Sequence, residues 1–156
     1  GRALAVFLGG ECIDTDDLIV EAAGRTIADI FAGEGEAGFR KREAEVIRRV
    51  VATPPAVLSV GGGAVLDERN VEALRSVATI VWLTAPATVL RKRIEADPTT
   101  AALRPHLTAE SSIEEVEHLL ENREPHYRGA AELIVDTTNA APEQIAREIA
   151  VRLGLV

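Results

Sequence analysis

The hydrophobic positions along the chain follow two different periodicities, which together predict strands that alternate with helices. Short, mostly apolar segments predict strands at residues 11–14, 56–60, 79–83 and 133–136. Between them, apolar residues that recur every three or four positions predict helices over residues 2–8, 17–23, 26–31, 38–52, 68–76, 87–96, 113–123 and 142–153. Such an alternation implies a parallel sheet in a layered α/β domain.

Glycine and proline mark the expected ends of these elements. Gly9 and Gly24 each follow a predicted helix, where glycine is the usual capping residue. Prolines at 54 and 55 end one helix, and the helix that starts at residue 113 should stop before Pro125. Residues 97–112 are polar and contain two prolines, so we expect them to be irregular. No repeat or linker interrupts the chain, and we expect one domain over residues 1–156.

Composition excludes several classes of function. The net charge of -8 argues against a nucleic-acid partner, which would need a basic surface, although a few arginines can still make one site locally positive. Cys12 is the only cysteine, so no disulfide can form within the chain, and a cytoplasmic location is the natural expectation. No run approaches the roughly 18 apolar residues that a membrane span requires, so we expect no membrane association.

Two short motifs follow predicted strands, where ligands bind in open α/β sheets. Asp14 and Asp16 flank Thr15 at the end of the first strand. Carboxylates there could orient a magnesium shell or accept a proton, but they could equally cap the next helix. The three glycines at 61–63 follow the second strand. They either present backbone amides to a ligand or form a flexible turn.

Three arginines are candidates for anion binding. Arg40 lies near the start of a predicted helix, where a cation gains nothing from the helix dipole. Arg104 and Arg123 each lie close to a helix-breaking proline. A guanidinium binds carboxylate and phosphate through two parallel hydrogen bonds, so these arginines could surround an anionic substrate. Taken singly, each could also be an ordinary surface arginine.

The order of these motifs closely resembles the shikimate kinase family. The blocks are Asp-Thr-Asp, Gly-Arg-Thr-Ile-Ala-Asp-Ile-Phe, Gly-Glu followed by Phe-Arg and Glu, Leu-Ser-Val-Gly-Gly-Gly-Ala-Val, Arg-Pro and Arg-x-Pro-x-Tyr. Their spacing is kept from residue 1 nearly to the C-terminus. The resemblance implies a three-layer P-loop kinase-like fold with strand order 2-3-1-4-5. It also implies transfer of a phosphoryl group from ATP to the 3-hydroxyl of shikimate, in the pathway to chorismate and the aromatic amino acids.

The resemblance also assigns roles to individual residues. It implies that Asp16 binds the shikimate hydroxyls and acts as the base, while Asp14 helps to hold Mg²⁺ through water. The shikimate carboxylate would be bound by Arg40 and Arg123, and the ring would lie on the backbone of Gly61, Gly62 and Gly63. Arg104 would be the lid arginine that reaches the ATP phosphates and stabilises the charge of transfer. We expect a monomer.

On the adenine side, Lys92 and Arg93 compete for one conserved arginine position, and we favour Arg93. Residues 138–142 resemble the loop that contacts adenine, with Ala140 as the expected contact. The lid segment between Arg93 and Arg104 is longer than in the shortest family members, so lid closure could differ.

The chain departs from the family at its start. The family opens with a strand and the loop Gly-x-x-x-x-Gly-Lys-[Ser/Thr], but residue 1 aligns within the helix that follows, and no Gly-Lys-Ser or Gly-Lys-Thr occurs here. Because that strand is central, we expect a gap of nearly twice the usual ~4.8 Å strand spacing, unless another segment fills it. We therefore expect an N-terminally truncated domain that binds ATP poorly and turns over little. The alternatives are a noncatalytic binding or regulatory domain and a related small-molecule kinase.

Overall fold

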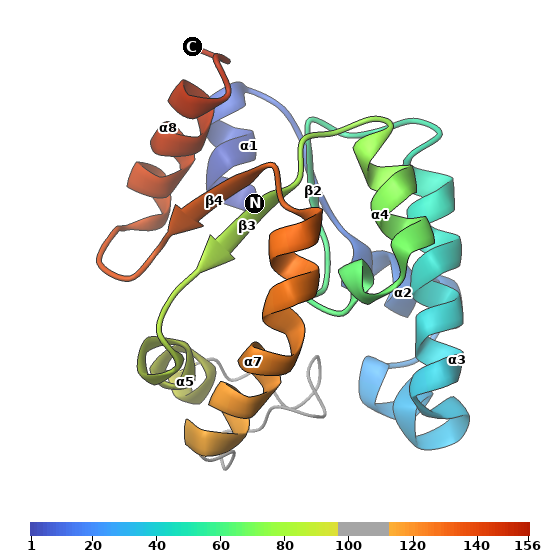
Figure 1. Cartoon of the computed structure of the whole chain (residues 1–156). Coiled ribbons are helices and arrows are strands. Elements are labelled where there is room, and N and C mark those ends of the chain that lie inside the picture. Colours follow the sequence, from blue (N-terminus) through green and yellow to red (C-terminus); the bar gives the residue numbers. More distant parts are fainter. Residues whose placement is uncertain (97–112) are drawn as a thin grey trace.

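A computed structural model describes residues 1–96 and 113–156 of the chain. Its strands form two separate parallel pairs, which confirms the expected α/β architecture (Figure 1). In the first pair β1 lies beside β2, and in the second β3 lies beside β4. The bounds are Cys12–Asp14 for β1, Val57–Ser59 for β2, Val81–Thr84 for β3 and Leu133–Asp136 for β4.

A wide opening separates the two strand pairs. No ladder joins β2 to β3 within the described residues. A cavity of about 1010 Å³ lies there instead, lined by residues of both strands and by Leu4 of α1 (Arg2–Leu8). The gap expected from the sequence is therefore present, and the cavity runs on toward the carboxyl ends of the strands.

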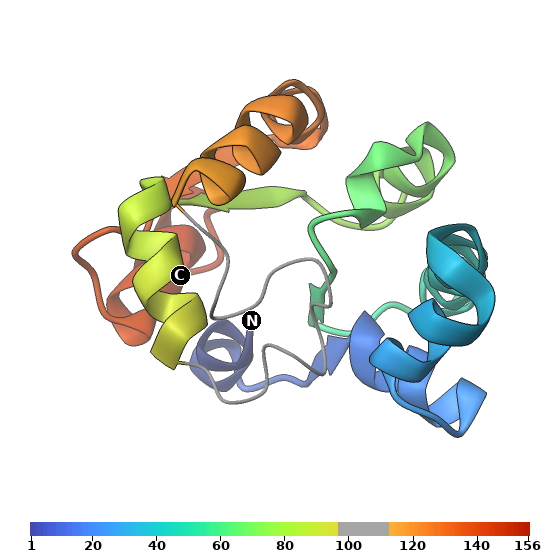
Figure 2. The same ribbon diagram turned by 90° about the horizontal axis from the view of Figure 1, so that it is seen from below.

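Helices cover both faces of the β3–β4 pair (Figures 1 and 2). On one face α1 packs against α8 (Pro142–Arg152), and Leu4 and Ile149 of these helices meet Val135 of β4 in one apolar cluster. On the other face lies α7 (Ile113–Ala130), whose Tyr127 ring contacts Trp82 of β3. None of the helices in the described ranges is long and apolar enough to cross a membrane.

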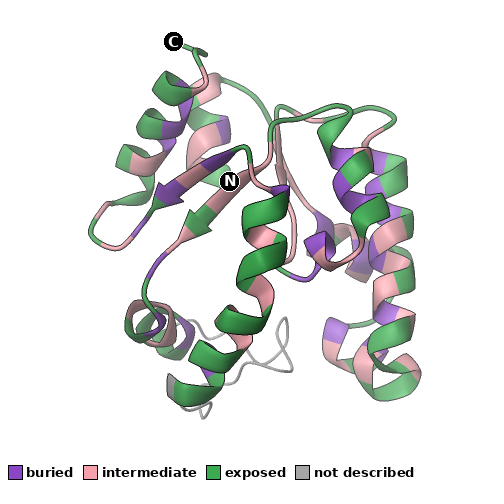
Figure 3. Ribbon diagram, viewed as in Figure 1, coloured by how far each residue is buried: buried purple, intermediate pink, exposed green. Residues whose placement is uncertain are grey.

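The β1–β2 pair packs against a second group of helices. Leu58 of β2 contacts two apolar clusters, one centred on Ile30 and the other on Ile47. In Figure 3 the buried residues gather on the inner sides of the helices, and α7 and α8 expose their outer sides.

The remaining elements are α2 (Thr15–Ala23), α3 (Ile27–Val50), the 3₁₀ turn η1 (Ala64–Leu66), α4 (Glu68–Arg75) and α5 (Ala87–Ala96).

Two helices that the sequence predicts separately, over residues 26–31 and 38–52, are the two arms of α3. The helix begins with a capping box, in which the Thr26 hydroxyl accepts from the Asp29 amide at 3.1 Å. It kinks at Gly35, whose φ of 69° lies in the left-handed region that glycine adopts without strain. One non-helical residue thus separates two helical arms, as the two separately predicted helices imply.

The prediction that a helix stops before Pro125 is wrong. In the structure α7 continues to Ala130. A proline inside a helix removes the hydrogen bond to the carbonyl four residues earlier, here that of Glu121. Both Pro125 and Glu121 are exposed, so water can reach the freed carbonyl. The helix end is held instead by Arg75, whose Nη2 donates to the carbonyl of Gly129 at 2.6 Å.

Candidate active site

The carboxyl ends of β1 and β2 bring the first two motifs together. Asp14 is in register with Ser59, so the segments that follow each strand leave the sheet side by side. A β-carbon placed on Gly61 would lie 3.7 Å from Asp16 Oδ1 and 3.3 Å from Glu43 Oε1. Two carboxylates therefore approach the start of the glycine run.

The second arm of α3 places a guanidinium beside this glycine run. Arg40 Nη1 donates to Glu43 Oε2 at 2.7 Å, and Arg40 Cζ lies 5.2 Å from the centroid of the Phe39 ring. The Arg40 guanidinium occupies the space that a β-carbon on Gly63 would need. Glycine at this position thus allows Arg40 to lie directly against the backbone.

Glu43 is a buried carboxylate with one strong partner. Its side chain is 1% exposed, and its Oε1 has no hydrogen-bond partner among the described residues. Burial raises the pKa of Glu43, and the hydrogen bond and charge of Arg40, with the charge of Arg123, oppose that rise. The charge of Arg123 thus acts on this carboxylate from α7.

Helix α7 closes the other side of the glycine run. A β-carbon on Gly62 would lie 2.8 Å from the Tyr127 hydroxyl oxygen. The Tyr127 ring is held against Trp82, with centroids 5.5 Å apart. Arg123 precedes Tyr127 by one turn of α7 and lines the cavity as Tyr127 does.

Most of the candidate site residues line the cavity between the strand pairs. They are Asp16, Arg40, Gly61, Gly62, Gly63, Arg93 and Arg123. They come from five different segments of the chain, yet they face one space. Asp14 and Ala140 are not in the lining, and Arg104 lies outside the described residues.

A model of the family described as shikimate kinase matches residues 1–153 of the chain. The chain belongs to the shikimate kinase family. A shikimate kinase of Rhodopirellula baltica is 40% identical over 148 residues, which cover 95% of this chain and 79% of that protein. Shikimate kinase 2 of Dickeya chrysanthemi is 45% identical over 138 residues, which cover 88% and 79%.

Solved shikimate kinases share the fold. The enzyme of Acinetobacter baumannii, in complex with shikimate, matches with a TM-score of 0.88 and 34% identity, over 99% of this chain and 85% of that one. The enzyme of Aquifex aeolicus matches with a TM-score of 0.80 and 30% identity, over 99% and 87%. The function of the chain is that of a shikimate kinase, an ATP-dependent phosphotransferase with an alcohol acceptor.

In this shikimate kinase the side chain of Asp14 caps α2. Its Oδ1 accepts from the Asp16 amide at 3.0 Å. The helix-cap reading of the Asp-Thr-Asp motif is therefore correct for Asp14, and it fixes the start of the helix that carries Asp16. The described residues contain no group of three or more His, Cys, Asp and Glu side chains that could hold a metal ion. One carboxylate is nevertheless enough for Mg²⁺, which keeps several waters and also binds substrate phosphates.

The adenine-side candidate Arg93 lies on α5, the helix after β3, and contacts the segment that follows β4. Arg93 donates to the Thr137 hydroxyl at 2.8 Å and to the Thr137 carbonyl at 2.5 Å. The Thr137 hydroxyl in turn donates to the Thr84 carbonyl at 3.1 Å. Arg93 lines the cavity and Lys92 does not, so the geometry favours Arg93. Ala140 lies three residues after Thr137, in the connection to α8.

Glu43 and Tyr127 are residues of this cavity that sequence reasoning did not assign to the site. The available signals were the i,i+3 spacing from Arg40, which places Glu43 on the same helix face, and the tyrosine that ends the Arg-x-Pro-x-Tyr block. Neither spacing indicates burial. The near-complete burial of Glu43 results from packing between α3 and the glycine run.

We expect the stability of the fold to fall as pH rises above the ordinary Glu43 pKa of 4.5. With the pKa of Glu43 raised, the folded state holds a proton that the unfolded state has already released. The unfolding free energy therefore keeps falling until the pH passes the pKa of Glu43 in the folded state. Within this window each pH unit should remove at most about 1.4 kcal/mol of unfolding free energy. Urea unfolding between pH 4 and pH 8 measures the slope of the unfolding free energy against pH, and Glu43→Gln should flatten it.

The control Glu45→Gln removes an exposed carboxylate of the same helix and should keep this slope. A slope in Glu43→Gln equal to that of the parent would contradict the prediction.

Proposed function

We propose that the cavity beside the glycine run binds shikimate and orients it for phosphoryl transfer. One observation carries this proposal: Asp16, Arg40 and Arg123 line the same cavity as the three glycines. This arrangement offers two guanidiniums to a carboxylate, a carboxylate to hydroxyl groups and a flat backbone surface to a ring. Shikimate presents a carboxylate, three hydroxyls and a ring.

Each residue then has a chemical role. Arg40 and Arg123 bind the substrate carboxylate, and Glu43 holds the Arg40 guanidinium in place through its 2.7 Å bond. Asp16 accepts hydrogen bonds from the hydroxyls and takes the proton when the 3-hydroxyl oxygen attacks the terminal phosphorus of ATP. ADP leaves as the new phosphorus–oxygen bond forms. Because phosphoryl transfer requires little covalent chemistry from the protein, positioning of the substrates and neutralisation of charge supply most of the rate enhancement.

On the nucleotide side, the candidate residues are Arg93, Ala140 and Asp14. Arg93 and the loop at Ala140 adjoin each other at the ends of β3 and β4, where they could bracket adenine. Asp14 would hold Mg²⁺ through a water molecule, with the same carboxylate that caps α2 through its Oδ1. When bound, the ion neutralises charge on the phosphates. The role of Arg104, the monomeric state, the cytoplasmic location and a single domain over residues 1–156 remain predictions from the sequence.

The proposal predicts shikimate binding that Trp82 can report. Trp82 is the only tryptophan of the chain, and it lines the cavity. Its fluorescence should change on titration, with a Kd between about 1 μM and 1 mM, the usual range for enzyme substrates. Methyl shikimate, whose ester is uncharged, should bind much more weakly because Arg40 and Arg123 lose their anionic partner.

Two outcomes separate the parts of the proposal. A chain that is folded by circular dichroism but binds shikimate and its ester equally would contradict the proposed carboxylate site. A separate ATP titration tests the expectation, drawn from the sequence, that this chain binds ATP poorly. Binding of shikimate together with weak ATP binding would support both statements, whereas normal ATP affinity would refute only the second.

A further inference from the structure

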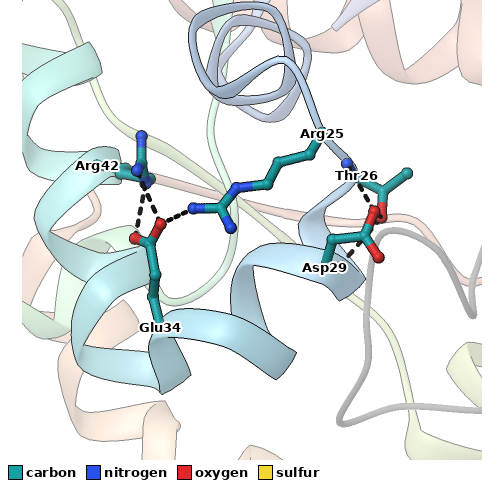
Figure 4. Close-up of polar contacts among 5 residues, drawn as sticks. All are labelled: Arg25, Thr26, Asp29, Glu34 and Arg42. Atoms are coloured by element: carbon teal, nitrogen blue, oxygen red, sulfur yellow. Dashed lines mark hydrogen bonds and ion pairs between the residues drawn. The ribbon is translucent and has the colours of Figure 1, made fainter.

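One carboxylate joins the chain before α3 to the far arm of that helix (Figure 4). Arg42 donates to Glu34 twice, from Nε to Oε2 at 2.9 Å and from Nη2 to Oε1 at 2.8 Å. Arg25, which precedes the Thr26 cap, forms an ion pair with Oε1 of the same glutamate. We refer to Arg25, Glu34 and Arg42 as the clamp.

The clamp spans the kink of α3. Glu34 ends the first arm, Gly35 forms the kink, and Arg42 lies in the second arm. On a straight helix only residues three or four apart are neighbours, and residues eight apart are separated by about 12 Å along the axis. A two-bond contact between Glu34 and Arg42 therefore depends on the bend, and it holds the bend at one angle.

Close packing supports the clamp on both sides of the bend. A β-carbon on Gly38 would overlap the side chain of Glu34 and lie 3.0 Å from its Oε2, so the clamp needs glycine there. On the cavity side, Phe31 of the first arm stacks on Phe39 of the second, with ring centroids 4.8 Å apart. The two phenyl rings line the cavity that Arg40 also lines. The angle between the arms thus determines where Phe39 and Arg40 lie relative to Gly63.

We propose that the clamp positions Arg40 for the substrate carboxylate. Glu34 is not among the residues that line the cavity; it acts through the angle of the second arm, which carries Arg40 and Glu43. Loss of the Glu34 charge weakens both of its ion pairs at once and lets the second arm turn about Gly35. The inference rests on the proposed function, because it concerns the binding of a carboxylate by Arg40.

Shikimate titration of Glu34→Gln tests the proposal. The amide keeps the shape but loses the charge, and we expect the Kd to rise about 3- to 10-fold, because a partly exposed ion pair is individually weak and a misplaced binding group adds to its loss. Gly38→Ala should raise the Kd similarly, and combining the two changes should add little. The matched control is Glu148→Gln, which removes an ion pair with Arg152 on α8, far along the chain from the kink, and should leave the Kd unchanged.

A second readout does not depend on shikimate. Amide hydrogen exchange at residues 36–43 should be faster in Glu34→Gln than in the parent and unchanged in Glu148→Gln. Parental affinity in Glu34→Gln would overturn the proposal, even if the melting temperature fell, because the clamp would then be merely structural. If the parent itself did not bind shikimate, the proposed function would fail. The exchange rates alone would then show whether Glu34 holds the second arm of α3. Unchanged exchange at residues 36–43 in Glu34→Gln would overturn the clamp as well.

Discussion

Replacing Gly63 by alanine should weaken shikimate binding about 100-fold, the size of effect that misplacement of a binding group by about 1 Å can have. The new methyl group would overlap the Arg40 guanidinium, which lies directly against the Gly63 backbone. Arg40 would have to leave this position, and with it the 2.7 Å hydrogen bond to Glu43. The buried carboxylate would then lose its strongest stabilising partner, so its pKa should rise further. Titration of Trp82 fluorescence with shikimate measures the effect.

The control for this change is another glycine. A β-carbon on Gly129 of α7 would meet nothing within 4 Å. Gly129→Ala should therefore leave shikimate binding unchanged and should stabilise the fold slightly, by up to about 1 kcal/mol, because alanine favours the helix. Equal affinities in Gly63→Ala and the parent would show that Arg40 does not need its observed position.

Replacing Arg123 by methionine should weaken shikimate binding about 10- to 100-fold, since a hydrogen bond to a charged partner contributes about 1.5–3 kcal/mol. Methionine keeps much of the side-chain length and removes the guanidinium. Because Arg123 also lowers the pKa of Glu43, its loss should favour the protonated form of that carboxylate. Arg123→Lys should recover only part of the affinity, because an ammonium cannot form the two parallel bonds of a guanidinium.

A thermodynamic cycle isolates the contact between Arg123 and the carboxylate of shikimate. The parent should prefer shikimate to methyl shikimate strongly, and Arg123→Met should show a much smaller preference. If the preference were unchanged, Arg123 would contribute through general electrostatics or packing rather than through the carboxylate. Arg147→Met, on the exposed side of α8, makes the same change in net charge and should leave the preference intact.

The sequence predicted those parts of the fold that depend on local chemistry. Helix α5 and strand β4 have the predicted bounds, and Gly9 and Gly24 cap their helices with φ of 65° and 64°. The sequence did not predict a helix end that depends on a tertiary contact. That helix is the long α7, in which Arg75 of another helix caps an end that Pro125 was expected to place earlier.

For the candidate site, the motifs predicted which residues would lie close together but not the contacts that those residues make with one another. Asp16, Arg40 and Arg123 were expected from the resemblance, and they line one cavity. Spacing along the chain places Glu43 beside Arg40, but it could not show that Glu43 is buried or that Tyr127 lies over Gly62, because burial and the second contact depend on distant segments. The capping role of Asp14 can be predicted from the sequence, since an aspartate before a helix often accepts a backbone amide.

The separation of the strands into two pairs has a consequence for cooperativity. Since no backbone ladder in the described chain joins β2 to β3, the two halves can open in separate subglobal steps. Shikimate would bridge them, because Arg40 comes from the half that contains β1 and β2, whereas Arg123 lies on α7, which packs against β3. A bound substrate would therefore act as a noncovalent crosslink that opposes such separate opening.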